Sequence, residues 1–275
     1  MPIDKEDYLE PNCVLCGEPF GAEPKIRPVP QQRIMEKVDE YMSRRDYAGV
    51  ERHLLYWLEE AKLGRDEKGE LMIRNELIGH YRKVLDRENA FGQIDAAVAL
   101  IDAMDYADTI SAGTTYVNAA TAMNAFGENE RAIELFRKAR AVYESAPALK
   151  PELLGGLYNN MALTLVSLGR FREADELYRN ALETMARAEN GALEQAITYL
   201  NMANAAEDES GLVDAAETID EDLSKAQALL DTPSVPRNGY YAFVCEKCAP
   251  TFAYYGWFAY EAELNERAKT LYERA

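Results

Sequence analysis

The stretch Tyr158–Ala181, which reads YNNMALTLVSLGRFREADELYRNA, decides the fold of this chain. It contains two runs of apolar residues at helical spacing, and Gly169 separates them. Glycine commonly marks the end of a helix. The stretch therefore predicts a helical hairpin, that is, two helices joined by a short turn.

Close relatives of this stretch recur on both sides at an interval of 42 residues. Gly127, Gly169 and Gly211 share the interval, and each precedes an alanine by five residues. The alanines in the same register are Ala48, Ala90, Ala132, Ala174 and Ala216. A period of roughly 20–50 residues is typical of a solenoid, in which each hairpin buries its apolar face on its neighbours. Small residues at these positions would let the helices approach closely.

The repeated positions resemble the tetratricopeptide repeat. In that family, helix A carries a large, a small and an aromatic residue, and helix B carries alanine, an aromatic residue and alanine. The quoted stretch matches with Tyr158, Ala162 and Leu165, then Ala174, Tyr178 and Ala181; the repeat before it matches with Tyr116, Ala120 and Met123, then Ala132, Phe136 and Ala139. The long period is similar to the version seen in kinesin light chains. The resemblance implies an all-α fold, a right-handed α-solenoid of about six hairpins.

The two ends of the array depart from this pattern. The first repeat has Glu36 and Arg52 where small and aromatic residues are usual. In the last repeat, the small Ala268 follows Ala216 by 52 residues, which predicts an insertion of ten residues around Thr232–Gly239. The last repeat is then expected to match with Phe252, Gly256 and Ala259, followed by Ala268, Tyr272 and Ala275.

Residues 1–30 differ from the rest of the chain. They hold six of the 11 prolines, and proline fixes φ and removes a backbone donor, so a long helix is not expected there. From Gln31 to Ala146 there is no proline, and the apolar residues keep a helical period without the alternation of strands. We therefore expect an extended arm over residues 1–30 and a helical solenoid over residues 31–275.

The charge and hydropathy of the chain argue against several classes of function. A formal net charge of −18 opposes binding to nucleic-acid phosphates or to an anionic membrane surface, and it favours a basic or neutral partner. No stretch approaches the roughly 18 uninterrupted apolar residues of a membrane span. The acidic N-terminus has no apolar core like that of a signal peptide. The cytoplasm is the expected compartment.

Four cysteines form two C-x-x-C pairs, Cys13/Cys16 and Cys245/Cys248. In a reducing cytosol such pairs indicate metal or redox sites rather than a disulfide framework. Together they supply four thiolates, the ligand set of a structural zinc ion, and Gly17 after Cys16 is typical of a zinc knuckle. The alternative is that the cysteines simply pack in the core.

A zinc ion shared by the two pairs would tie the arm to the last repeat. Stacked hairpins would span on the order of 50 Å at about 9–10 Å per helix layer. Residues 17–30, fully extended, would reach about 46–50 Å. An intramolecular clasp is therefore feasible, and the alternative is a homodimer in which a second chain supplies one pair.

A second set of residues is expected to line the concave groove. Asn118, Asn160 and Asn201 follow the tyrosines of three successive first helices by two residues. The resemblance implies that this position faces the groove, where an amide can both donate to and accept from the backbone of an extended peptide. Tolerated asparagines on a wet helix face are the alternative. The residues expected on the same face are Thr121, Asn159, Asn204, Arg82 and Lys83.

Two further features lie near the C-terminal end. The segment Glu207–Asp222 holds eight acidic residues and no basic one, which predicts a solvated face or a docking patch for a basic partner. Nine aromatic residues lie between Tyr240 and Tyr260, which predicts a buried or covered last helix.

Catalysis finds little support in the sequence. The two histidines, His53 and His80, have no cysteine or carboxylate spacing around them, and no phosphate-binding or nucleophile motif is present. The sequence therefore predicts a non-enzymatic scaffold that binds a protein or peptide segment, with a structural zinc. The alternatives are a metal- or redox-sensing regulatory module and a thiol–disulfide oxidoreductase.

Overall fold

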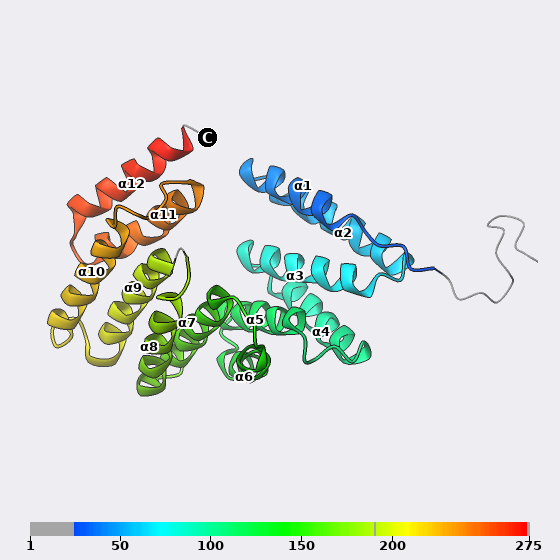
Figure 1. Ribbon diagram of the computed structural model, residues 1–275, viewed down its shortest axis with the longest axis horizontal. Coiled ribbons are helices and arrows are strands. Elements are labelled where there is room, and N and C mark those ends of the chain that lie inside the picture. Colours follow the sequence, from blue (N-terminus) through cyan, green and yellow to red (C-terminus); the bar gives the residue numbers. More distant parts are fainter. Residues whose placement is uncertain (1–24, 190, 274–275) are drawn as a thin grey trace, which may run out of the picture. The chain divides into compact units, whose positions relative to one another are not determined.

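The computed structural model describes residues 25–189 and 191–273 (Figure 1). Within them the chain is all-α, as the sequence predicts, with no strands. The helices are α1 (Gln31–Ser43), α2 (Tyr47–Leu63), α3 (Glu67–Lys83), α4 (Arg87–Ala103), α5 (Ile110–Ala125), α6 (Asn129–Ser145), α7 (Pro151–Ser167), α8 (Phe171–Met185), α9 (Gly191–Ser210), α10 (Ala216–Leu230), α11 (Gly239–Tyr254) and α12 (Phe258–Tyr272). No helix of this part of the chain is both long enough and apolar enough to cross a membrane.

The chain divides into two compact units, residues 1–73 and 74–275, and the division falls inside α3. In the first unit α1 packs on α2, and buried aliphatic residues such as Ile34 and Leu54 form its core. The end of the predicted arm lies against the α2–α3 turn: the Arg27 N–H donates to Gly64 O at 2.8 Å, and the Val29 N–H donates to Asp66 Oδ2 at 2.9 Å. The rest of the arm, residues 1–24, lies outside the described residues.

The second unit contains four regular hairpins, α5–α6, α7–α8, α9–α10 and α11–α12. Their first helices form one contiguous layer, because α7 contacts both α5 and α9, and α9 also contacts α11 (Figure 1). The small residues of the quoted stretch lie where the pattern requires: Ala162, Ala174 and Ala181 are all buried. The central hairpins therefore confirm the packing register read from the sequence.

The helices are joined by turns that share one backbone geometry. One residue of each turn has a positive φ: +70° to +84° at Gly127, Gly169, Gly211 and Gly256, and +51° to +59° at Arg45, Arg65, Leu85 and Asp105. In the turn at Gly169, the Arg170 N–H donates back to Leu165 O at 2.9 Å, which satisfies a carbonyl at the helix end.

The register of the alanines fails at two positions. Ala48 and Ala216 are exposed, whereas Val50 and Ala215 are buried. Val50 lies five residues after the turn residue Arg45, as Ala174 lies five residues after Gly169. A constant 42-residue interval hid this equivalence because the N-terminal turns recur every 20 residues, which gives a 40-residue period.

The predicted register of the last hairpin is wrong. Gly256 has φ +84° and lies in the α11–α12 turn rather than on a helix. It follows Gly211 by 45 residues, so the last repeat carries three extra residues over the 42-residue period, not ten. In the corrected register Phe252 corresponds to Leu165, Ala249 to Ala162 and Cys245 to Tyr158, and all three are buried.

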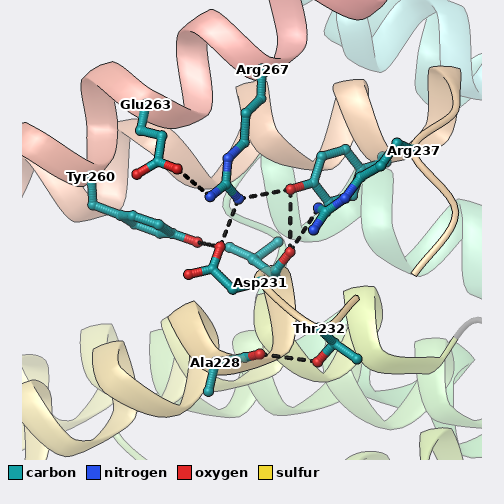
Figure 2. Close-up of polar contacts among 9 residues, drawn as sticks. Ala228, Asp231, Thr232, Arg237, Tyr260, Glu263 and Arg267 are labelled. Carbon is teal, nitrogen blue, oxygen red and sulfur yellow. Dashed lines mark hydrogen bonds and ion pairs between the residues drawn. The ribbon is translucent and has the colours of Figure 1, made fainter. Parts of the chain in front are cut away.

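A polar cluster fixes this last hairpin to the end of α10 (Figure 2). Asp231 Oδ1 accepts from the Tyr260 hydroxyl at 3.0 Å and from Arg267 Nη1 at 2.7 Å. Arg267 Nη1 also donates to the Tyr241 hydroxyl at 2.9 Å, and this hydroxyl donates to Leu230 O at 3.2 Å. The cluster links α10, α11 and α12, so it replaces part of the apolar packing that alanines supply elsewhere in the array.

Candidate functional site

Polar amides recur on the first helices of successive hairpins, at positions that bring them together. The Asn201 side chain on α9 donates an N–H to Asn159 Oδ1 on α7, at 3.1 Å. On the preceding helices, the Asn118 amide on α5 donates to Asn75 Oδ1 on α3, at 3.4 Å. Asn118, Asn159, Asn160 and Asn201 are all half-buried. The four helices α3, α5, α7 and α9 therefore carry an amide row, defined as Asn75, Asn118, Asn159, Asn160 and Asn201.

The pairing corrects one detail of the predicted equivalence. Asn201 was expected to correspond to Asn160, but it lies 42 residues after Asn159 and bonds to that residue. Asn160 instead corresponds to Asn118, which also lies 42 residues away. The row consequently contains two adjacent lines of amides rather than a single one.

Asn75 is a member of the row that the sequence reasoning missed. Its amide N–H donates to the Thr115 hydroxyl at 2.8 Å, while its oxygen accepts from Asn118. Asn75 lies 84 residues before Asn159, which is twice the 42-residue period, so the repeat itself contained the signal. The missing cue was the α3–α4 turn, where Leu85 occupies the position that glycine marks later in the chain.

The hydrogen bonds within the row leave part of each amide available for a ligand. A primary amide offers two N–H donors and an oxygen that can accept twice. The Asn159–Asn201 bond uses one donor of Asn201 and one acceptor site of Asn159. A half-buried amide that is oriented by its neighbour loses little side-chain entropy when it binds a peptide group. The row can therefore offer donors and acceptors at fixed positions.

The other predicted residues lie around the row in different roles. Thr121 is half-buried, and its hydroxyl donates to Val117 O of its own helix at 2.8 Å. Asn204 is exposed, and its oxygen accepts from the Tyr255 hydroxyl on α11 at 3.0 Å. Arg82 and Lys83 are exposed at the C-terminal end of α3.

The cysteine pair on α11 lies in an apolar core. The exposed fractions of Cys245 and Cys248 are 0% and 1%, and they pack with residues such as Val244 and Phe252. Burial raises the pKa of the Cys248 thiol to about 12, and burial also raises the pKa of Cys245. Zinc requires thiolates. The packing of this pair therefore does not fit a zinc site unless the end of the array opens.

The other half of the predicted zinc site, Cys13 and Cys16, lies outside the described residues. Among the described residues, no group of three or more potential metal ligands comes together. The contacts of Arg27 and Val29 also shorten the free arm, because only residues 17–26 remain to reach the second pair. Ten extended residues reach about 33–36 Å, less than the span expected for the stacked hairpins.

Three solved structures share this architecture. The crystal structure of BtubC (BKLC) from P. vanneervenii superposes with a TM-score of 0.63 at 16% identity, over 76% of this chain and 84% of that one. A putative kinesin light chain from Podosopora anserina with nearly identical TPR-like repeats gives 0.59 at 19% identity, over 73% and 96%. A point variant of that Podosopora anserina protein gives 0.60 at 19% identity, over 72% and 94%. The fold is a TPR-like helical solenoid. No protein-family model and no curated protein matches the chain.

Proposed function

We propose that this chain is a non-enzymatic scaffold that binds an extended segment of another protein along the amide row. The single observation that carries the proposal is the pairing of row amides between neighbouring hairpins, Asn118 with Asn75 and Asn201 with Asn159. Amides held at a repeating interval suit the repeating donors and acceptors of a peptide backbone. The TPR-like repeats of the structural neighbours are consistent with this function.

The chemistry of the row indicates what it would recognise. Asn118, Asn160 and Thr121 are uncharged, so they would hold the main chain of the ligand with little preference among side chains. Selectivity would come from flanking groups, with Arg82 and Lys83 as the basic ones. The net charge of −18 favours a ligand that is neutral or basic overall.

Peptide display against the full chain tests the proposal. The test variant is Asn118→Ala with Asn160→Ala, because these two amides lie in one line of the row and the Asn159–Asn201 bond stays intact. The matched control is Asn180→Ala with Asn265→Ala, which removes two amides from the second helices α8 and α12. We expect peptides selected on the wild type to lose at least about tenfold in affinity for the test variant only. Equal affinity for wild type and test variant, with unchanged helicity, would contradict the proposal.

A further inference from the structure

The C-terminal ends of α9 and α11 form a second surface that the amide row does not use. Both oxygens of the Glu207 carboxylate accept hydrogen bonds from α11: the Tyr254 hydroxyl donates to one at 2.9 Å, and the Tyr255 hydroxyl donates to the other at 2.8 Å. The two tyrosine rings lie at 80° to each other with centroids 4.9 Å apart. A carboxylate is thus fixed against two aromatic rings by neutral donors rather than by a basic side chain.

The chain supplies no base to this region. Residues 188–224 contain ten acidic residues and no lysine, arginine or histidine, and residues 248–266, which include the α11–α12 turn, also lack a basic residue. Lys225 pairs with Glu221 and Asp222, which lie further along α10. Among the described residues, no ion pair involves Glu207, Asp208 or Glu209. Three neighbouring carboxylates therefore lack a cationic partner within the chain.

The position of these carboxylates is electrostatically unfavourable for an isolated chain. Glu207, Asp208 and Glu209 lie in the last turn of α9, which ends at Ser210. The C-terminal end of a helix carries a partial negative charge and prefers cations. Three acids there repel both the helix end and one another. A cation from another molecule would relieve that repulsion.

Exposed apolar side chains border the acids. The exposed fractions are 87% for Val213, 68% for Tyr254, 67% for Phe258 and 53% for Leu212. Leu212 and Val213 lie in the turn after α9, and Tyr254 and Phe258 flank the turn after α11. The Trp257 indole N–H donates to Asp220 Oδ1 at 3.3 Å, so the α11–α12 turn also contacts the acidic helix α10. Acidic and apolar groups thus share one continuous surface.

We propose that this surface, which we call the acidic–aromatic patch (Glu207, Asp208, Glu209, Leu212, Val213, Tyr254, Tyr255 and Phe258), docks a basic segment of a partner protein. Lysine or arginine side chains would lie against the carboxylates and over the tyrosine faces, where a cation is attracted by the ring. Aliphatic side chains of the segment would cover Leu212 and Val213. The inference does not depend on the amide row, because the two surfaces share no residue.

A short fluorescent peptide that repeats Lys-Arg-Leu tests the patch by anisotropy on the full chain. The test variant is Glu207→Gln, Asp208→Asn and Glu209→Gln. The control variant is Glu130→Gln, Glu176→Gln and Glu183→Gln, which removes the same charge from exposed positions on α6 and α8. We expect about tenfold weaker binding for the test variant, equivalent to roughly 1.4 kcal/mol, and little change for the control.

The aromatic part is tested by Tyr254→Ala, with Tyr272→Ala as its control, because both tyrosines are exposed and each donates to a glutamate. Only Tyr254→Ala should weaken the binding of the basic peptide. Equal weakening by the two triple variants would reduce the effect to net charge and overturn the proposal. Absence of measurable binding to the wild type at low salt would also overturn it.

Discussion

Tyr178 carries a buried hydroxyl without a described partner. Its side chain is buried on α8, and no hydrogen bond to the hydroxyl is made by the described residues. Phe136 occupies the same position one repeat earlier, 42 residues before, and is equally buried without a hydroxyl. The array therefore contains a natural precedent for an apolar ring at this site.

We predict that Tyr178→Phe stabilises the protein by about 1 kcal/mol, because an unsatisfied buried polar group costs roughly 1–3 kcal/mol. Urea unfolding measures the change. The reverse substitution, Phe136→Tyr, should destabilise and is the matched control. A less stable Tyr178→Phe protein would mean that the hydroxyl has a partner.

Cys248 separates a buried thiol from a zinc thiolate. Burial raises the pKa of the folded thiol to about 12, above the value near 9 of an unburied thiol. The folded state then holds its proton more tightly, so the contribution to stability is complete below about pH 9 and is lost as the pH rises above it. We predict that the free energy of unfolding falls more steeply above pH 9 in the wild type than in Cys248→Ala.

The shared zinc site of Cys13, Cys16, Cys245 and Cys248 stays a prediction, and zinc content of the purified protein tests it. One zinc per chain, lost in Cys245→Ser, would support the site, and zinc-bound thiolates would not add to the alkaline loss of stability. Absence of zinc together with the alkaline loss would assign the α11 pair to the core, as its corrected repeat position indicates.

At the scale of helices and turns, the hairpins could be predicted where glycine marks the turn. Gly127, Gly169 and Gly211 disclose their positions because glycine is the residue that most easily takes a positive φ. Arg45, Arg65 and Leu85 adopt the same conformation without that cue. Their sequence signal is the aspartate that follows each of them, which caps the next helix: Asp46, for example, accepts from the Gly49 N–H at 2.8 Å.

The last hairpin was misplaced for a different reason. An alanine at the expected spacing is weak evidence, because Ala268 lies on α12 at the position equivalent to Ala181 rather than Ala174. The turn glycine Gly256 sets the register more reliably than the small residues do. The polar cluster around Asp231 and Arg267 could not be predicted, since it depends on side chains that only the folded hairpins bring together.

Two alanines in one predicted register give a sharp test of helix packing. Ala174 is buried between helices, whereas Ala216 is exposed at the start of α10. We predict that Ala174→Leu overpacks its hairpin and costs about 1–3 kcal/mol. Ala216→Leu should change stability by less than about 0.5 kcal/mol. Similar melting temperatures for the two variants would reject the corrected register.

At the scale of the whole molecule, the chain combines a regular array with two surfaces of different chemistry. The sequence predicted Asn118, Asn159, Asn160 and Asn201 as ligand-facing residues, and the structure brings the asparagines of neighbouring helices into contact. It did not predict that Tyr254 and Tyr255 orient Glu207, because aromatic residues in a sequence do not disclose which neighbours their hydroxyls meet.

The division of the chain inside α3 limits what the sequence pattern could establish. A repeat pattern implies one continuous solenoid over residues 31–275, but the compact units end and begin at residues 73 and 74. Asn75 lies in the second unit together with the rest of the amide row. Binding to the row can therefore be examined as a property of the second unit.

Hydrogen–deuterium exchange of the full chain, with and without a peptide selected on the wild type, tests the central claim most directly. The account predicts slower exchange in α5 and α7 and in the N-terminal part of α9 around Asn201, with α6, α8 and α10 unchanged. Slowing confined to α6, α8 and α10, or to α1 and α2, would contradict the claim that the amide row is the binding face.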